Sequence, residues 1–586
     1  MARKSSKSTH PLLRVKLSPA RSRALMLMLA LAFVSLAARA AYLQVFNDDY
    51  LREQGGKRYE VGIELPASRG RILDRNGVVL AASLPARSVA VFPGQWRESL
   101  PSRPAGEPGR QVGELARLLG QPEPDLRRKL EEEDRKYVYL KRQVDLDVAG
   151  RIDALKVPGI DMRREYKRHY PEGEMLAHVI GFTNVEDRGQ EGMELSQQPQ
   201  LAGQPGHRRI IRDRLGNPIE DVQAIREPRD GGDVTLSIDS KIQFLVHNAL
   251  ADAMREQRAK AAAAVVIDVQ TGEVLALSNF PNFNPNDRRG LSGAQLRNRV
   301  MTDIFEPGST MKPFTVALAL ELNKTTPRSV IQTAPGKLTI NGATIGDAHP
   351  HGPLTVEQII EKSSNVGTAK LALAMQPHDM WSMFVSLGFG QAPQIGFPGA
   401  VAGRVRPYKN WKPIEQATMS YGHGISVSLA QMARAYTVFA RNGDIVPLSM
   451  MKTDGPVAGV QVVRPEVAQA MRRMLEMAAG PKGTAPKAQV VGYSVAGKTG
   501  TAYKQENGRY VKKYVSSFVG FAPASNPRLV VAVLIDEPGA GKHFGGEVAA
   551  PVFSRIVGDS LRAMRVAPDT PFAKLVIPDK AVEESL

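Results

Sequence analysis

The sequence predicts a chain with two folded regions behind one membrane anchor: a single N-terminal transmembrane helix, an extended α+β region and a larger α/β domain. Three observations predict this organisation. A basic segment at residues 1–23 precedes the largely apolar residues 24–46. Strand pairs and helical patterns alternate over residues 47–230, and buried strands with amphipathic helices fill residues 231–566. Residues 567–586 form a C-terminal tail.

Length and composition exclude several classes of protein. At 586 residues the chain is too long for one compact core. Its formal net charge of +18 is spread along the chain without a zinc-finger, RRM or helix-turn-helix pattern, so no nucleic-acid partner is expected. The chain has no cysteine, which excludes disulfides, thiolate metal sites and a thiol nucleophile and suits an oxidising compartment.

The N-terminal segment predicts a single-pass inner-membrane protein. As a helix, residues 24–46 would span roughly 35 Å, more than the bilayer core of about 30 Å. The basic flank is expected to stay in the cytoplasm, which places everything after residue 47 in the periplasm. Ala38-Arg39-Ala40 also resembles a signal-peptidase site, but the apolar stretch continues past it to Tyr42. Arg39 is expected to snorkel to the outer interface.

Residues 47–230 predict a structural or partner-binding region. Asn76-Gly77 lies between two strand-like runs in residues 69–83 and favours a hairpin with a two-residue turn. A Pro/Gly-rich segment separates this hairpin from the helical patterns at residues 112–120 and 124–133. No nucleophile-base pattern occurs here, and turn chemistry explains the charged segment around Glu194 as well as catalysis does.

Residues 231–566 predict a larger α/β domain. Two strands flank a turn at residues 270–272, and two more flank residues 523–527. Another strand is expected to leave a glycine turn near residue 492, and helical patterns cover residues 356–365 and 428–443.

Within this domain Ser309 and Lys312 follow a Pro-Gly break. If a helix begins near Ser309, a spacing of three residues places the hydroxyl and the ammonium on one helical face, where they can touch. A serine at a helix N-terminus is well placed to become a nucleophile when a neighbouring base takes its proton. A Ser-x-x-Lys motif alone also occurs by chance in a chain of this length.

Two further motifs follow it in order: Ser363-Ser364-Asn365 and Lys498-Thr499-Gly500. The same triple is typical of serine β-lactamases and penicillin-binding proteins. With the anchor, the hairpin segment at residues 69–77 and the segment at residues 181–195, the chain resembles the class B penicillin-binding proteins, most closely their division-specific FtsI type. The resemblance also covers residues 282–286, 420–436 and 545–553.

This resemblance implies an elongated α+β pedestal of dimerisation type at residues 47–230. It also implies an α/β, serine β-lactamase-like transpeptidase domain at residues 231–566, with an antiparallel sheet flanked by helices. The implied activity is a periplasmic D,D-transpeptidase that cross-links peptidoglycan stem peptides through a serine acyl-enzyme and is acylated by β-lactams. Neither a metal nor a cofactor is needed, and His349 and His351 are interpreted as polar loop residues.

The resemblance also assigns the site residues. Ser309 is the nucleophile, and Lys312 is the base if burial and nearby positive charge hold it neutral. Ser363 relays a proton to the leaving amine and Asn365 holds the substrate amide. Lys498 supplies fixed positive charge. The substrate-binding group is Thr499, Gly500 and Thr501, and the oxyanion hole is formed by the backbone N–H groups of Ser309 and Thr501.

Several alternatives remain. A class A β-lactamase would carry a water-activating glutamate in a Glu-x-x-Leu-Asn type segment between the second and third motifs, and none occurs there. The region before residue 230 is too short for a glycosyltransferase domain, so a separate SEDS-type membrane glycosyltransferase of the FtsW type is the expected partner, together with other divisome membrane proteins. An elongation-specific transpeptidase, a β-lactam sensor and a non-catalytic divisome scaffold are the other candidates.

Overall fold

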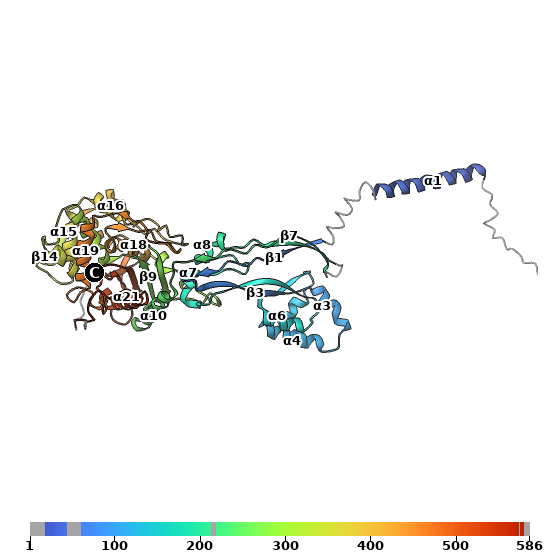
Figure 1. Cartoon of the computed structure of the whole chain (residues 1–586), viewed down its shortest axis with the longest axis horizontal. Coiled ribbons are helices and arrows are strands. Elements are labelled where there is room, and N and C mark those ends of the chain that lie inside the picture. Colours follow the sequence, from blue (N-terminus) through green and yellow to red (C-terminus); the bar gives the residue numbers. More distant parts are fainter. Residues whose placement is uncertain (1–17, 44–59, 213–217, 573–574, 579–586) are drawn as a thin grey trace, which may run out of the picture. The chain divides into compact units, whose positions relative to one another are not determined.

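The computed structural model describes residues 18–43, 60–212, 218–572 and 575–578. Packing divides the chain into two units. The first comprises residues 1–67 and 204–229, and the second comprises residues 68–203 and 230–586 (Figure 1).

The first unit contains the predicted N-terminal apolar helix, α1 (Pro19–Ala41). Pro19 occupies the first helical turn behind Ser18, whose hydroxyl accepts the N–H of Arg21. With a mean hydropathy of 2.1 and no buried residue, α1 is a candidate membrane span by length and composition. It begins before the predicted residue 24, and residues 44–46 of the predicted span lie outside the described part of the chain. The Arg39 guanidinium lies 5.6 Å from the Tyr42 ring centroid.

The same unit contains a three-stranded antiparallel sheet in which β6 lies between β1 and β7. Its strands are β1 (Glu60–Leu65), β6 (Gly206–Arg212) and β7 (Pro218–Arg226).

The second unit begins with a five-stranded sheet built around the long strand β3, which pairs with β4 and β5 on its two edges. Four helices cover one face, where Val89 and Leu140 pack on Leu115 and Ile152 in one apolar cluster. The strands are β2 (Ile72–Leu73), β3 (Val79–Val91), β4 (Val138–Asp145), β5 (Ile160–His169) and β8 (Val234–Thr235), and the helices are α3 (Pro93–Ser99), α4 (Glu107–Leu119), α5 (Glu123–Leu130) and α6 (Leu146–Ala154).

The connection between β2 and β3 differs from the predicted two-residue turn. It spans residues 74–78, and the Asp74 carboxylate accepts the backbone N–H groups of Asn76 at 2.7 Å and Val78 at 2.8 Å. Gly77 has a positive φ of 87°, whereas Asn76 does not. A type I′ turn needs positive φ at both central residues. The two-residue prediction is therefore wrong, because the Asp74 side chain organises a longer loop.

Glu194 is also not a turn residue. It lies in α8 (Gly192–Ser196) and is fully buried, with its carboxylate oxygens 2.6 Å from Arg69 Nε and 2.6 Å from Arg168 Nε. Arg69 also donates to the Glu194 carbonyl at 2.7 Å and to the Asp187 carbonyl at 3.0 Å. We call Arg69, Arg168 and Glu194 the buried ionic cluster. It joins the start of β2 to the end of β5 and to α8.

A five-stranded antiparallel sheet forms the centre of the larger domain, in the order β10-β9-β19-β18-β17. The predicted hairpins around residues 270–272 and 523–527 are confirmed. The strands are β9 (Ala261–Asp268), β10 (Val274–Phe280), β17 (Ala496–Glu506), β18 (Arg509–Ala522) and β19 (Leu529–Asp536). Because β17 is the last strand in this order, one of its edges is not paired within the sheet.

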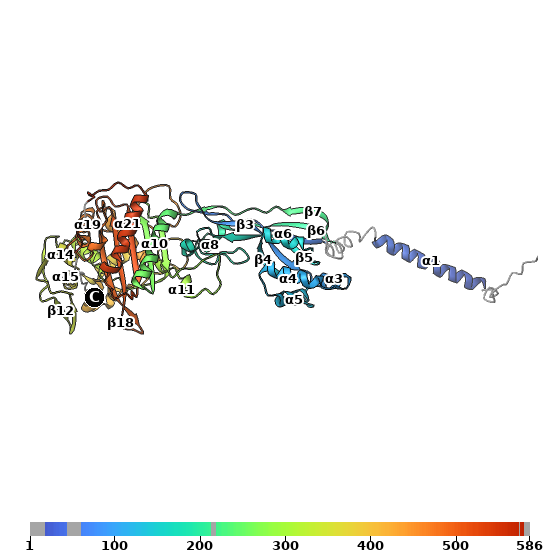
Figure 2. The ribbon, with the colours of Figure 1, turned by 90° about the horizontal axis from the view of Figure 1, so that it is seen from below.

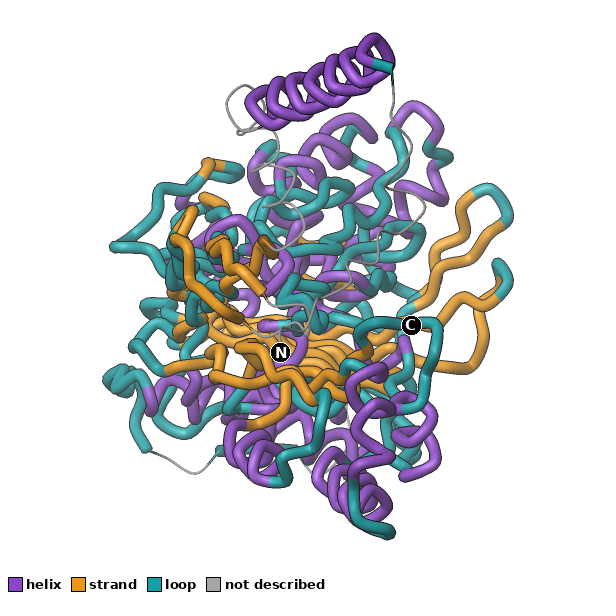
Figure 3. Tube along the Cα trace, turned by 90° about the vertical axis from the view of Figure 1, so that its right-hand side faces the viewer, coloured by secondary structure: helices purple, strands orange, loops and turns teal. Residues whose placement is uncertain are grey.

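Helices cover both faces of this sheet (Figures 2 and 3). Side chains alternate along β9, so Ala264 and Val266 pack with α10 and α21, whereas Val265 and Ile267 pack with the helices of the opposite layer. This explains why β9 is an unbroken apolar run. The helices against the first face are α10 (Ser240–Gln257) and α21 (Ala550–Ala563); those of the opposite layer include α13 (Lys312–Glu321), α14 (Val356–Lys362), α16 (Pro377–Ser386), α18 (Leu429–Ala440) and α19 (Pro465–Ala479).

Shorter elements complete the second unit. The short helices are α7 (Ala177–Ile180), α9 (Gln198–Leu201), α11 (Gly293–Leu296), α12 (Arg299–Thr302), α15 (Asn365–Leu373), α17 (Pro413–Met419) and α20 (Gly545–Val548), and the short strands are β11 (Val330–Gln332), β12 (Lys337–Ile340), β13 (Ala343–Gly346), β14 (Pro353–Thr355), β15 (Asp444–Ile445) and β16 (Val460–Gln461).

Candidate active site

The Pro-Gly break places Ser309 at the start of a helix, as the sequence predicts. A single 3-10 turn covers Gly308–Met311 and leads directly into α13. Gly308 has a φ of 55°, and a Cβ atom there would lie 3.1 Å from the Thr501 carbonyl oxygen. Glycine therefore permits both the backbone conformation and the close approach of this turn to β17.

Lys312 joins the first two motifs. Its Nζ donates to Ser309 Oγ at 2.8 Å, to Ser363 Oγ at 2.9 Å and to the Ser363 carbonyl at 2.6 Å. All three residues are at most 3% exposed. The expected contact between Ser309 and Lys312 is present, and the structure adds Ser363 to the same cluster. We call these three residues the catalytic cluster.

The second motif lies at the junction of two helices. Ser363 ends α14 with a left-handed φ of 61°, and Ser364 caps α15 by accepting the Gly367 N–H. Ser364 donates to Asp347 at 2.7 Å, and Asn365 Nδ2 donates to the Gly346 carbonyl at 3.0 Å. Among the residues that the structure describes, the buried Asn365 Oδ1 has no hydrogen-bond partner. A buried, unsatisfied amide oxygen is available to a donor on a ligand.

The third motif lies on β17. Lys498 is fully buried, and its Nζ lies 3.1 Å from Thr499 Oγ1 and 3.4 Å from Thr484 Oγ1. At Gly500 a Cβ atom would lie 2.6 Å from Ser517 Oγ and 2.7 Å from the Pro307 carbonyl oxygen, so only glycine fits there. This residue lets the edge strand approach the turn that carries Ser309.

Thr501 completes the strand part of the site. Its carbonyl lies against Gly308, and its Oγ1 accepts the Gly545 N–H at 3.0 Å. The structure thus gathers the three predicted motifs around one buried serine. A buried hydroxyl that contacts an amine, beside a second hydroxyl, suits nucleophilic acyl transfer.

Sequence reasoning missed three residues that support this arrangement. Thr484 contacts both Lys498 and Thr499, at 3.4 Å and 3.1 Å. Asp347 accepts both the Ser364 hydroxyl and the Val366 N–H. Neither residue lies within a motif, so only the fold brings them to the site. Asp347 lies in the loop after β13 that also carries His349 and His351.

The third missed residue is Glu306, three positions before the serine. Its carboxylate accepts the Gly424 N–H at 2.9 Å and the Tyr510 hydroxyl at 2.9 Å, and His423 Nδ1 lies 3.4 Å away. Burial raises the pKa of Glu306, but hydrogen bonds from His423, Gly424 and Tyr510 outweigh it and hold the pKa below its ordinary value. Glu306 therefore presents a fixed negative charge near the turn that carries Ser309.

Comparisons with known proteins agree with this geometry. Residues 262–558 match the family model of the penicillin-binding protein transpeptidase domain, and residues 64–236 match that of the penicillin-binding protein dimerisation domain. The chain is 41% identical over 552 residues to the "Probable peptidoglycan D,D-transpeptidase PenA" of Neisseria gonorrhoeae, covering 94% of each chain. It is 41% identical over 549 residues to the "Peptidoglycan D,D-transpeptidase FtsI" of Escherichia coli, covering 93% of this chain and 91% of the relative.

A solved structure agrees as well. The transpeptidase domain of penicillin-binding protein 3 from Burkholderia pseudomallei is 54% identical, with a TM-score of 0.54, and the match covers 57% of this chain and 98% of that one. The resemblance predicted from the three motifs is confirmed. With both domains matched in order and relatives similar along nearly its whole length, the protein belongs to the penicillin-binding protein transpeptidase family.

Proposed function

We propose that this protein is a peptidoglycan D,D-transpeptidase that cross-links stem peptides through a serine acyl-enzyme. The observation that carries the proposal is the position of Lys312 Nζ, within hydrogen-bond distance of both Ser309 Oγ and Ser363 Oγ. The names of the relatives support the same activity.

In the first step Ser309 Oγ attacks the carbonyl carbon between the two terminal D-alanines of a donor stem peptide. Lys312, in its neutral form, accepts the hydroxyl proton. The backbone N–H groups of Ser309 and Thr501 stabilise the oxyanion, an effect typically worth about 3–4 kcal/mol per donor. Ser363 passes the proton from Lys312 to the leaving amine, and D-alanine departs.

The residues around the catalytic cluster hold the donor peptide. Its carboxylate faces Lys498 and the hydroxyls of Thr499 and Thr501, and Gly500 leaves room for its backbone. The Asn365 side chain, whose Oδ1 has no partner among the described residues, receives the substrate amide. The free edge of β17 suits an extended peptide, which can pair with it as an added strand.

In the second step the amine of a neighbouring stem peptide attacks the acyl-enzyme, and the new cross-link leaves Ser309. A β-lactam acylates Ser309 in place of the donor. The chain lacks the water-activating Glu-x-x-Leu-Asn type segment between the second and third motifs, which favours aminolysis over hydrolysis.

The proposal extends to the biological role. The division-type relatives favour septal wall synthesis, with an elongation role as the alternative. Helix α1 anchors the chain in the inner membrane with its N-terminus in the cytoplasm and the catalytic domain in the periplasm. A SEDS-type glycosyltransferase of the FtsW type supplies the glycan strands. The proposed segments are the cytoplasmic residues 1–23, the anchor 24–46, the pedestal 47–230, the transpeptidase domain 231–566 and the tail 567–586.

A coupled assay tests the activity. The purified chain is incubated with a stem pentapeptide donor ending in D-Ala-D-Ala and an amine acceptor, and products are separated by mass. We expect the acceptor adduct and free D-alanine, both abolished by penicillin. Free D-alanine with hydrolysed donor alone would identify a carboxypeptidase instead.

Depletion in the native organism tests the role. Filaments with segregated chromosomes are expected if the protein builds the septum. Rounded cells that still divide would assign it to elongation.

A further inference from the structure

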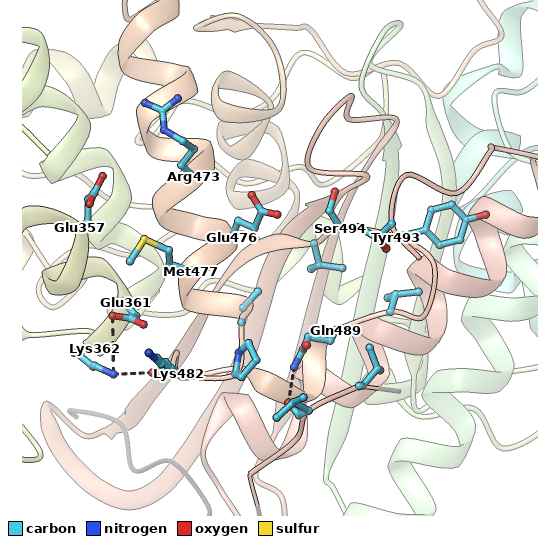
Figure 4. Close-up of a pocket in the computed structure, with 18 of the residues that line it drawn as sticks. Glu357, Glu361, Lys362, Arg473, Glu476, Met477, Lys482, Gln489, Tyr493 and Ser494 are labelled. Carbon is cyan, nitrogen blue, oxygen red and sulfur yellow. Dashed lines mark hydrogen bonds and ion pairs between the residues drawn. The ribbon is translucent and has the colours of Figure 1, made fainter. Parts of the chain in front are cut away.

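A large cavity lies away from the three motifs. Its volume is about 1260 Å³, and it lies between α14 and α19 on one side and residues 489–495 on the other (Figure 4). We call it the α14–α19 cavity. Its polar lining includes Glu361, Lys362, Lys482 and Gln489, and Met477 and Val490 contribute apolar surface.

Part of the C-terminal tail forms one wall of this cavity. We call residues 567–572 and 575–576 the C-terminal strap; Thr570, Leu575 and Val576 line the cavity. Gln489 Nε2 donates to the Val576 carbonyl at 3.1 Å. The Gly492 carbonyl accepts the N–H groups of Asp569 and Thr570. The protein thus binds this strap through its backbone, as it would bind a separate peptide.

Side chains add specificity to these contacts. The Asp569 carboxylate accepts the Ser494 N–H at 2.8 Å, the Ser525 hydroxyl at 2.6 Å and the Ser494 hydroxyl. Burial raises the pKa of Asp569, but the hydrogen bonds from Ser494 and Ser525 outweigh it and lower the pKa, so the carboxylate is charged. The Phe572 ring lies against Gly492, where a Cβ atom would be 2.9 Å from the ring.

The strap nevertheless buries little apolar surface. Phe572 is 74% exposed and Val576 is 64% exposed, although both are apolar. A segment with little buried apolar surface and exposed hydrogen bonds opens at low free-energy cost. By this criterion the strap is among the segments of the domain that open most easily.

The cavity is connected to the active site at two points. Lys362, the last residue of α14, donates to the Lys482 carbonyl at 2.8 Å, and the next residue in the chain is Ser363 of the catalytic cluster. Lys482 is two residues before Thr484, which contacts Lys498 and Thr499.

The second connection is the strap itself. Ser494, which binds Asp569, lies two residues before the start of β17, the strand that carries Lys498. The strap thus contacts the residues that lead into β17, and Lys362 contacts the loop that leads to Thr484. Both segments are continuous with residues in or beside the third motif.

We propose that the C-terminal strap is a reversible ligand of the α14–α19 cavity, bound within its own chain, and that its seating increases the rate at which Ser309 is acylated. This inference rests on the proposed function, since it concerns the rate of the same serine. The strap residues touch neither the substrate nor Ser309, so they are positioning residues. The recognised ligand is a peptide with an aspartate three residues before a phenylalanine, bent at the aspartate.

The test uses a chain that ends at Ala567. Loss of the Asp569 and Val576 contacts is expected to slow fluorescent-penicillin acylation about fivefold to tenfold. A synthetic peptide of residues 567–586 should bind the shortened chain saturably and restore the rate. The same peptide with Asp569→Ala should not. An unchanged rate in the shortened chain would overturn the proposal, as would equal rescue by a scrambled peptide.

A second variant covers the case in which the shortened chain does not fold. Asp569→Ala in the full-length chain removes the carboxylate that accepts from Ser494 and Ser525 and keeps the rest of the strap. Acylation of this variant should be slower than that of the wild type, and an excess of the synthetic peptide of residues 567–586 should restore the rate. An unchanged rate in Asp569→Ala would contradict the proposal, as would a reduced rate that the peptide does not restore.

The wild-type adduct separates this inference from the proposed function. If the full-length chain forms no penicillin adduct on Ser309, the transpeptidase proposal fails. If the adduct forms at the same rate in every strap variant, only the strap proposal fails.

Discussion

The buried ionic cluster and the catalytic cluster lie in the same packing unit, and both bury ionisable side chains almost completely. In the ionic cluster one carboxylate, Glu194, contacts two guanidinium groups at 2.6 Å. In the catalytic cluster the hydrogen bonds from Lys312 to Ser309 and Ser363 end on uncharged oxygens. In the ionic cluster a negative charge is paired with positive charges. In the catalytic cluster an amine lies against two hydroxyls.

The two clusters therefore contribute to different properties of the protein. Removing one partner of a buried ion pair leaves an uncompensated charge and costs stability. Removing an amine that contacts two hydroxyls removes a proton acceptor and costs rate. We therefore expect substitutions in the two clusters to separate into folding defects and catalytic defects, with little overlap.

The largest effect is expected at Lys312. Lys312→Met keeps the length of the side chain but removes the amine, so acylation by fluorescent penicillin should fall by about a thousandfold. The melting temperature should change little, because the methionine fills the same buried space. Acylation within tenfold of the wild type would remove Lys312 from the mechanism.

The opposite pattern is expected in the ionic cluster. Glu194→Gln leaves the buried Arg69 and Arg168 without their counter-charge and should cost roughly 3–5 kcal/mol of stability. Denaturant unfolding measures this, and the folded variant should acylate within about twofold of the wild type.

The matched control is Glu186→Gln, which breaks a half-exposed ion pair with Arg142. It should cost less than about 1 kcal/mol. Equal costs for the two variants would contradict a stabilising role for the buried cluster.

The dependence of the unfolding free energy on pH gives a further test. Burial lowers the pKa of His178 to about 4, whereas an unfolded histidine titrates near 6.5. As the pH falls from 7 toward 4, the unfolded chain therefore gains a proton that the folded chain resists, and stability should decrease by roughly 3 kcal/mol. His178→Gln should flatten this slope in unfolding experiments.

The titration of Asp187 has the opposite effect on stability. Burial raises its pKa to about 6, so the folded chain binds a proton more readily than the unfolded chain, and stability increases as the pH falls through 6. Asp187→Asn should therefore steepen the acid-induced loss. If the stability of this variant fell less steeply with acid than that of the wild type, the pKa of Asp187 would not be raised in the folded chain.

The smallest effect is expected at Thr484, which supports the third motif. Thr484→Val keeps the shape but removes the contacts with Thr499 and Lys498. Losing one such hydrogen bond costs about 1 kcal/mol, so acylation should slow about fivefold. The Thr484→Ser variant should recover most of the rate, and failure of that rescue would assign the loss to packing.

Local patterns predicted much of this fold and site. The apolar helix, the two hairpins of the larger sheet, and the contact between Ser309 and Lys312 follow from periodicity and from a spacing of three residues. Glu194, Thr484 and Asp347 could not be predicted in the same way. Glu194 is 125 residues from Arg69, and Thr484 reaches the third motif only because α19 packs on β17. The loop that contains Asn76-Gly77 is longer than the predicted two-residue turn, because the Asp74 side chain accepts two backbone N–H groups within it.

The mass of the intact protein after reaction with penicillin shows whether Ser309 is the nucleophile. Wild-type and Ser309→Ala proteins are incubated with excess penicillin and compared. The wild type should gain the mass of one penicillin, and the variant should gain none while it unfolds at the same temperature. A penicillin adduct on Ser309→Ala would place the nucleophile elsewhere and contradict the account.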